Sequence, residues 1–300
     1  MNVNELKELV CKAIDNNYNK LFNLAKDIEN NPELGFKEIK TAEKVCKFFD
    51  ELNISYKDKL ALTGVKGQLK EKSDGPNVAI LGELDGVICF DSANANKETG
   101  ASHTCGHNLQ ITAMATAALG LKLSGIEDKL HGNVSFMAVP AEEFIEIEYR
   151  QKLKEEGKIH FLAGKQELIY RGAFDDVDMA MMIHSLKDTP KPTVALGSSS
   201  NGFIGKTIQY IGKTAHAAEA PHTGVNALNA AMLGLMGVNA LRETFKDEDS
   251  IRVHPIITKG GDTVNSVPAD VRMETYVRAN NVDAMKLTNK KVDKALLAGG

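Results

Sequence analysis

The chain has 300 residues, and at about 150 residues per domain this length predicts two domains with sizeable cores. Lys and Arg number 36 against 40 Asp and Glu, which gives a formal net charge of −4. The chain as a whole therefore has no net positive charge that would attract nucleic acid or an anionic membrane. No apolar run approaches the ~20 residues that span a bilayer. We expect the partners to be small molecules or proteins, with no nucleic acid and no membrane among them.

The N-terminus and the cysteines predict a cytoplasmic protein. The first residues mix charged and apolar side chains at helical spacing and lack the apolar core of a signal peptide. The four cysteines are too few and too irregularly spaced for a disulfide framework, so we expect free thiols. They are Cys11, Cys46, Cys89 and Cys105.

Residues 1–197 carry the pattern of an α/β domain. Apolar residues at helical spacing predict two amphipathic helices in the first fifty residues. Short apolar runs then alternate with helical stretches, which predicts a sheet covered on both faces. The predicted strands are 62–69, 78–84, 133–139 and 178–184, and a predicted helix occupies 108–123.

A second pattern begins after Pro190 and Pro192, with 198–202 as the expected linker, and predicts a small α+β domain over 198–300. The predicted strands are 203–211, 253–259 and 270–278, and the predicted helices are 225–244 and 282–297. The helix 225–244 is dense in Ala, Gly, Leu and Met, so we expect it to be buried on more than one side. Its composition favours a core helix, with a dimer contact through this helix or the neighbouring strand edge as the alternative.

Four polar segments follow predicted strands or precede the helix at 108. Three of them follow strands and end in Asp85, in the pair Glu142 and Glu143, and in His184. The fourth precedes the helix and holds Cys105 and His107. In open α/β sheets, ligands bind outside the carboxyl ends of the strands. We therefore expect these side chains to form one site.

The residue types at this site indicate metal chemistry. Cys105 and His107 are two residues apart, so in an extended loop their side chains point the same way. A thiolate with imidazoles and a carboxylate suits zinc, with manganese, cobalt or nickel as alternatives. The pair Glu142 and Glu143 suits a division between holding metal and moving protons.

A different chemistry is open for the same residues. Cys105 with His103 or His107 could act as an acyl-transfer pair, in which the cysteine is the nucleophile. That reading leaves the glutamate pair without a role.

The motifs resemble those of peptidase family M20, the metallopeptidases and amidohydrolases that include aminoacylases and bacterial carboxypeptidases. The resemblance lies in the order of the segments 31–38, 82–86, 103–108, 140–143, 172–184, 212–222 and 265–278, which spans nearly the whole chain. It implies an α/β/α zinc-peptidase-like catalytic domain of mixed sheet over residues 1–197. Residues 198–300 would then be an inserted α+β (βαββαβ) lid and dimerisation domain.

The resemblance also implies a reaction. A metal-dependent enzyme of this family hydrolyses an amide bond in N-acyl amino acids, aryl-amide conjugates or dipeptides. Two divalent metal ions would be bound, with Cys105 as the bridging thiolate and His107, Glu143 and His184 as further ligands. Glu142 would be the general base, and Asp85 would orient a ligand.

The lid residues implied by the resemblance act on the substrate. His216 would reach the active site of the partner subunit in a homodimer and stabilise the oxyanion. Asn265 and Arg278 would bind the substrate carboxylate, for which the planar guanidinium is suited.

Two departures from the family pattern affect these expectations. Family members continue past the lid helix with further strands and a metal-binding histidine, so we expect the natural protein to extend beyond Gly300. If it does not, a non-catalytic peptide or amino-acid binder on the same scaffold is the alternative. The segment 144–156 reads as a charged helix that either lies in solvent or reshapes the substrate pocket.

Overall fold

Two compact units make up the chain. The structure is a computed structural model that describes residues 1–71, 74–186, 194–197 and 199–300. One unit covers Met1–Pro190 and the other covers Lys191–Gly300. Pro190, Pro192 and Ser198, which mark the predicted boundary, lie outside the described residues. The division between residues 197 and 198 therefore stays a prediction.

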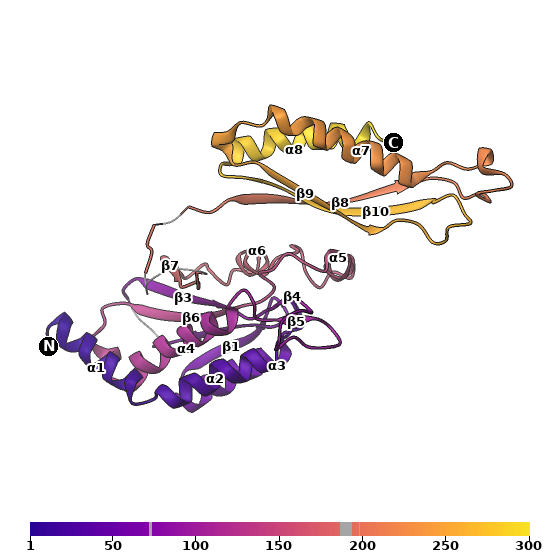
Figure 1. Ribbon diagram of the computed structural model, residues 1–300. Coiled ribbons are helices and arrows are strands. Elements are labelled where there is room, and N and C mark those ends of the chain that lie inside the picture. The colour runs from indigo at the N-terminus through magenta and orange to yellow at the C-terminus, as the bar shows by residue number, and fades with distance from the viewer. Residues whose placement is uncertain (72–73, 187–193, 198) are drawn as a thin grey trace. The chain divides into compact units, whose positions relative to one another are not determined.

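A five-stranded mixed sheet forms the centre of the first unit, with the order β1-β2-β6-β3-β7 (Figure 1). β3 pairs in parallel with both β6 and β7, whereas β1 and β2 are antiparallel to their neighbours. This confirms the predicted mixed sheet. The strands are β1 (Ser55–Leu60), β2 (Gly64–Gln68), β3 (Asn77–Glu83), β6 (Asn133–Val139) and β7 (Met179–Met182), and β4 (Val87–Ile88) pairs separately with β5 (Ala101–Ser102).

Helices cover both faces of this sheet. In Figure 1, α1 to α4 lie on one side of it, and α5 and α6 lie on the other. The central strands β3 and β6 are apolar along most of their length because both of their faces are covered. The helices are α1 (Val3–Asp15), α2 (Tyr18–Asn30), α3 (Ile39–Glu51), α4 (His107–Leu123), α5 (Ile147–Glu155) and α6 (Gly164–Tyr170), with a 3-10 turn at Glu127–Lys129.

Three elements of the first unit differ from the sequence expectations. The first fifty residues form three helices, not two, because α2 also has buried residues at helical spacing: Leu21, Ala25 and Ile28. The strand β1 lies at the edge of the sheet, and its residues are mostly exposed, so no apolar run indicates it. The short helix α6 has no clear periodicity in the sequence.

The second unit has the element order βαββα. Its antiparallel sheet has the order β8-β10-β9, and α7 and α8 pack together on it. The final strand of the implied βαββαβ order is not among the described residues. The elements are β8 (Gly202–Ile211), α7 (Ala227–Leu241), β9 (Arg252–Lys259), β10 (Asp270–Ala279) and α8 (Val282–Leu297), with 3-10 turns at Pro221–Thr223, Arg242–Thr244 and Asp247–Asp249.

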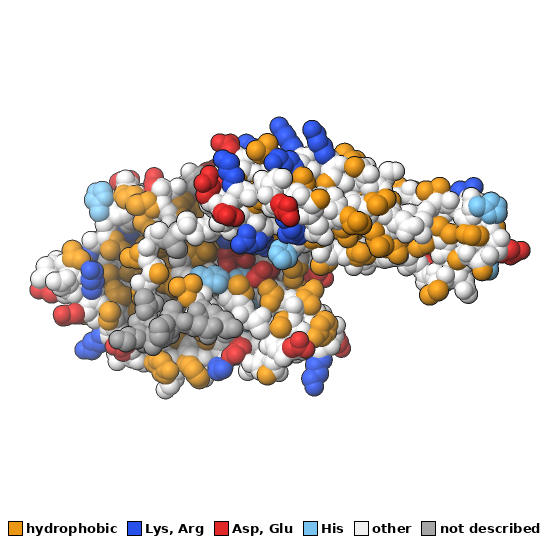
Figure 2. Space-filling model, turned by 45° about the horizontal axis from the view of Figure 1, so that its top comes forward, with side chains coloured by type: hydrophobic (Ala, Val, Ile, Leu, Met, Phe, Trp, Pro, Cys, Tyr) orange, Lys and Arg blue, Asp and Glu red, His pale blue; other side chains and the backbone are white. Residues whose placement is uncertain are grey.

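The helix α7 buries only one face within the chain. Ala227, Ala231, Gly234 and Val238 are buried against the sheet and α8. The other face is apolar but exposed, which corrects the expectation of burial on more than one side: Met232, Leu233 and Met236 are 53%, 57% and 64% exposed. In Figure 2, hydrophobic side chains spread over the visible surface of this unit.

Among the described residues, no helix combines the length and the apolar character that a membrane crossing requires.

The core of the first unit predicts a clear effect on stability. Phe136 of β6 is fully buried, and its ring centroid lies 6.2 Å from that of the buried Phe49. Replacing Phe136 by Ala leaves a cavity, so we expect the free energy of unfolding to fall by about 3–5 kcal/mol. Urea denaturation measures this loss. The matched control is Phe90→Ala, since Phe90 is 63% exposed. An equal loss in both variants would contradict the assigned core.

Candidate metal centre

The carboxyl ends of three parallel strands meet at one edge of the first unit's sheet. Asp85 follows β3, the pair Glu142 and Glu143 follows β6, and His184 follows β7. The N-terminus of α4 adds His107, and the loop before it adds Cys105. The structure therefore brings together the six residues of this unit that the sequence selects as one site.

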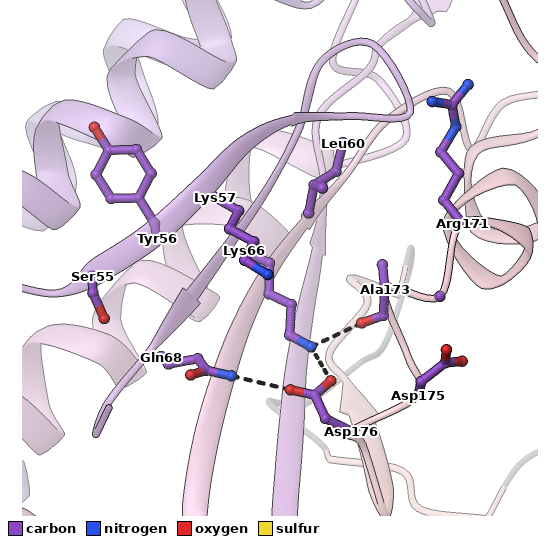
Figure 3. Close-up of a pocket in the computed structure, with 11 residues that line it drawn as sticks. Ser55, Tyr56, Lys57, Leu60, Lys66, Gln68, Arg171, Ala173, Asp175 and Asp176 are labelled. Atoms are coloured by element: carbon purple, nitrogen blue, oxygen red, sulfur yellow. Dashed lines mark hydrogen bonds and ion pairs between the residues drawn. The ribbon is translucent and has the colours of Figure 1, made fainter. Parts of the chain in front are cut away.

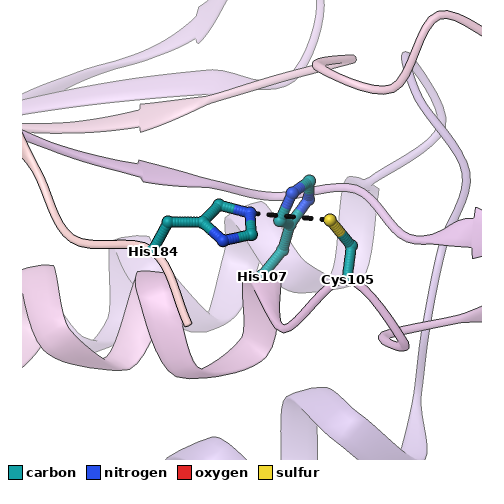
Figure 4. Close-up of side chains that lie close together, drawn as sticks. All are labelled: Cys105, His107 and His184. Atoms are coloured by element: carbon teal, nitrogen blue, oxygen red, sulfur yellow. Dashed lines mark hydrogen bonds between the residues drawn. The ribbon is translucent and has the colours of Figure 1, made fainter. Parts of the chain in front are cut away.

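Cys105, His107 and His184 form the core of the site. One donor atom from each lies within 4.8 Å of the other two. Figure 4 shows the three side chains converging, with Cys105 Sγ 3.5 Å from His184 Nε2. The two imidazole rings meet edge to face at 5.9 Å between centroids.

His107 is oriented by Asp85. Its Nδ1 lies 2.7 Å from the main-chain oxygen of Asp85 and 3.3 Å from the carboxylate of the same residue. A carbonyl oxygen only accepts hydrogen bonds, so Nδ1 carries the hydrogen and Nε2 points into the site. A carbonyl or carboxylate behind a histidine in this way is the usual support of a metal ligand.

Three carboxylates face Nε2 of His107. Glu83 lies 3.0 Å away, Glu142 lies 3.8 Å away and Glu143 lies 4.0 Å away. Burial acts to lower the pKa of His107, but its contacts with Asp85, Cys105 and Glu83 prevail and raise it. Burial raises the pKa of Glu142, with the charge of Glu83 acting in the same direction.

Glu83 is a site residue that the sequence reasoning missed. With His107 and Glu142 it forms a second group whose donor atoms lie within 4.8 Å of one another. Burial acts to raise its pKa, but the hydrogen bond with His107 and the charge of Lys165 outweigh burial and lower the pKa to about 2. The spacing of two residues between Glu83 and Asp85 at a strand end is the signal that could have found it.

Lys165 of α6 is the second missed residue. Its ammonium group contacts the carboxylate of Glu83 and lies 3.7 Å from Glu142. Nothing in the sequence around Lys165 marks it, because its role depends on a helix folding back over the ends of β3 and β6.

These residues fit a divalent metal. The donor set contains a thiol, two imidazoles and several carboxylates, which is a set that zinc accepts. Several carboxylates crowd the largely buried imidazole, and a bound cation would offset their negative charge. Both groups include His107, and because its Nδ1 is hydrogen-bonded to Asp85, its Nε2 can bind only one ion.

The loop before α4 requires glycine at position 106. Gly106 has φ of +86°, which is a left-handed conformation, and a Cβ added there would lie 2.2 Å from Ser185 Oγ. The absence of a side chain lets the segment after β7 approach the start of α4. Cys105 and His184 meet for this reason.

A polar network fixes the entry to β7. Lys66 is buried, and its ammonium group contacts Asp176 and the main-chain oxygen of Ala173 (Figure 3). Asn77 of β3 donates to the main-chain oxygen of Asp176 at 2.8 Å. The cavity beside this network measures about 490 Å³ and is lined by none of the predicted site residues. The network holds the segment that leads to His184.

The second unit contains the other predicted residues. The backbone around His216 pairs with Ser266, and Ala217 N–H donates to the main-chain oxygen of Asn265, so His216 and Asn265 lie on adjoining loops. Arg278 lies at the other end of β10, with its guanidinium 5.3 Å from the ring of Phe203. At about 3.4 Å per residue, β10 separates the two locations by roughly 27 Å.

Comparisons with known proteins agree with this class of fold. Residues 198–298 match the peptidase dimerisation domain of the M20 peptidases. The chain is 29% identical to the Xaa-Arg dipeptidase of Mus musculus over 98% of this chain and 63% of that protein. It is 25% identical to the N-acetylcysteine deacetylase of Bacillus subtilis over 94% of this chain and 72% of that protein. A dinuclear metal-binding M20 peptidase of Bacillus subtilis shares its fold, with a TM-score of 0.58 at 22% identity over 94% of this chain and 71% of that one.

The fold is thus that of the M20 peptidases: a mixed-sheet α/β domain with a dimerisation domain. The chain is a relative of the M20 peptidases and amidohydrolases, which confirms the resemblance seen in its motifs. It spans 63% of the length of the mouse dipeptidase.

Glu38 makes stability depend on pH. It is fully buried, and its carboxylate accepts from Ala141 N–H at 2.7 Å and from Thr63 Oγ1 at 2.6 Å. Burial and the charge of Asp85 raise its pKa from 4.5 to about 7. A raised pKa means that the folded state holds the proton more tightly, so the contribution to stability is full below pH 4.5 and is lost as the pH rises through 7.

We therefore expect the free energy of unfolding of the wild type, relative to Glu38→Gln, to decrease between pH 4.5 and 7 and then to level off. Urea denaturation at a series of pH values measures the difference. Glu43→Gln, at an exposed position of the same helix, serves as the control and is expected to show no such decline. A flat difference for Glu38→Gln would contradict the assignment.

Proposed function

We propose that the protein is a metal-dependent amidohydrolase that cleaves the amide bond of N-acyl amino acids, aryl-amide conjugates or dipeptides. The observation that carries the proposal is the meeting of Cys105, His107 and His184 beside the Glu142–Glu143 pair at one sheet edge. The names of its relatives support the substrate class: one acts on Xaa-Arg dipeptides and another on N-acetylcysteine.

Cys105, His107, Glu143 and His184 would hold two divalent metal ions, and we propose zinc. Two ions are proposed from the family resemblance, and a structural neighbour is described as a dinuclear metal-binding peptidase. When bound, such ions polarise the substrate carbonyl and lower the pKa of water to about 7.

Glu142 is the proposed general base. Its carboxylate lies at the mouth of the donor set, 3.8 Å from His107 Nε2 and 3.7 Å from Lys165 Nζ. It takes a proton from the attacking water and delivers it to the leaving amine. Burial raises its pKa, which favours holding that proton between the two steps. Glu142 and Glu143 lie at nearly equal distances from His107, so their division of roles comes from the family resemblance.

The second unit would supply the substrate contacts. We propose that His216 stabilises the oxyanion in the site of a partner subunit, and that Asn265 and Arg278 bind the substrate carboxylate. The length of β10 between Arg278 and the loops of His216 and Asn265 supports contributions from two copies of the chain to each site. A cytoplasmic homodimer is the form in which we expect the enzyme to act.

One observation favours a second candidate. Cys105 Sγ lies 3.5 Å from His184 Nε2, as in a cysteine–histidine nucleophile pair. A hydrogen bond with His107 acts to lower the pKa of Cys105, but burial and the neighbouring Glu143 prevail and raise it. A raised pKa disfavours the thiolate that a nucleophile needs. The metal enzyme is therefore the better explanation.

Substitutions at Glu142 and Cys105 test the proposed roles. We expect Glu142→Gln to lower kcat by about 10²–10⁴-fold while zinc content stays near that of the wild type, since the residue moves a proton. Cys105→Ala is expected to lose bound zinc. Elemental analysis and a hydrolysis assay over N-acyl amino acids and dipeptides provide the two measurements. Cys11→Ala, at an exposed position of α1, is the control for loss of a thiol.

The outcomes separate the candidates. Full activity in both variants would contradict the metal mechanism. Inactivation by thiol alkylation together with indifference to chelators would favour the cysteine nucleophile. Absence of bound metal in the wild type after zinc reconstitution would favour the non-catalytic binder.

The exposed face of α7 predicts the dimer contact. We propose that this apolar face, where Met236 is 64% exposed, is the dimer contact, and a lysine at Met236 would place a charge on it. We expect Met236→Lys to shift the protein from dimer to monomer in sedimentation velocity. Ile169→Lys, at a 59% exposed position of α6, is expected to remain dimeric. A dimer that persists in Met236→Lys would place the interface elsewhere.

A further inference from the structure

The helix α5 is anchored in the first unit by an arginine. Its buried residues are Ile147, Arg150 and Leu153, and Arg150 is 0% exposed. The segment 144–156 thus contains a helix with one face in solvent and the other packed against the first unit. Its charged face lies outward, and its inner face places a guanidinium group beneath the strand end that carries the glutamate pair.

Arg150 contacts the main chain on both sides of Glu142. Its Nη2 donates to the main-chain oxygen of Glu143, and its Nη1 lies 3.5 Å from that of Ala141. Nη1 also donates to the main-chain oxygen of Leu162 at 2.8 Å. The guanidinium carbon lies 5.5 Å from the ring centroid of Phe36, which fixes the plane of the group.

The backbone that Arg150 contacts has an unfavourable conformation. Ala141 has φ of 47°, in the left-handed region that a residue with a Cβ seldom adopts. Such a conformation persists only where the surroundings hold it. Its N–H donates to Glu38 at 2.7 Å, and its oxygen accepts from Gly164 N–H at 3.1 Å. The next residues are tied by Glu143 N–H, which donates to Asp85 at 2.9 Å.

Gly35 leaves room for this arrangement. A Cβ at Gly35 would lie 2.4 Å from Arg150 Nη2 and 2.9 Å from Ala141 Cα. The segment 31–38 therefore supports the turn in three ways. Gly35 leaves space for Arg150 and Ala141, the ring of Phe36 contacts the guanidinium of Arg150, and Glu38 accepts from Ala141 N–H. The motif in this segment therefore has a physical role at the turn that precedes Glu142.

We propose that Arg150 is a positioning residue that holds the left-handed turn at Ala141, so that Glu142 and Glu143 point toward His107. The proposal rests on the proposed function only for the roles of Glu142 and Glu143, the two residues that this turn positions. Main-chain oxygens at a turn are not hydrogen-bonded by neighbouring strands of the sheet. The planar guanidinium group of an arginine carries several N–H donors and can hydrogen-bond more than one of these oxygens at once. A lysine carries the same charge but not the same geometry.

The test compares Arg150→Gln and Arg150→Lys with Lys152→Gln, whose side chain on the outer face of α5 is 74% exposed. The measurements are amide hydrogen exchange of residues 141–144, zinc affinity by competition with a chromogenic chelator, and kcat and KM on the best substrate of the assay panel. Circular dichroism and thermal unfolding identify which variants fold.

Both Arg150 variants are expected to exchange amides 141–144 at least about tenfold faster than the wild type, with helices α1 to α4 unchanged. Zinc affinity is expected to fall by about 10–100-fold, as for losses of groups that orient metal ligands. The kcat is expected to fall by about 10–100-fold with KM within about threefold, since misplacement of a reacting group acts on the chemical step. Lys152→Gln is expected to match the wild type in all three.

Wild-type exchange and zinc affinity in a folded Arg150→Gln would overturn the proposal. If Arg150→Gln does not fold, Arg150→Lys decides by the same readouts. A wild type that binds no zinc and hydrolyses no substrate would overturn the proposed function instead. In that case, unchanged exchange at 141–144 in the variants still contradicts the role of Arg150, and faster exchange supports it.

Discussion

Parallel pairing of β3 with β6 and β7 is the constraint on which the site depends. Strands that run in the same direction end at the same edge, and the residues after them meet there. A shift of register by one residue would turn the side chains at these ends to the opposite face of the sheet. The network of Lys66, Asn77 and Asp176 holds the segment before β7, and so it sets where that strand ends.

Asp85 connects the parts of this edge. Its main-chain oxygen accepts from His107 at the start of α4, and its carboxylate accepts from Glu143 N–H after β6. One residue therefore orients an imidazole and a glutamate together. The carboxylates around His107 repel one another, and Lys165 and the histidine itself offset this charge in the chain alone. The proposed metal ions would take over that role.

The sequence was most informative where a strand and a motif coincide. The apolar runs before Asp85 and Glu142 mark buried parallel strands, and the polar residues after them share an edge, so their meeting could be predicted. Lys165 and Arg150 could not, because each reaches the site from a helix whose position depends on tertiary packing. The segment 144–156 has the composition of a solvated helix. Its proposed role depends on Arg150, whose burial cannot be read from that composition. The edge strand β1 lacks the apolar pattern that burial imposes on the central strands.

The central claim is that Cys105 and the two histidines bind metal together. X-ray absorption at the zinc edge of the zinc-loaded protein tests it most directly. We expect one sulfur neighbour for each zinc ion that Cys105 holds, at about 2.3 Å, with the remaining neighbours nitrogen and oxygen at about 2.0–2.2 Å. The sulfur contribution should vanish in Cys105→Ser. A wild-type spectrum without sulfur, or one dominated by several sulfur ligands, would contradict the account.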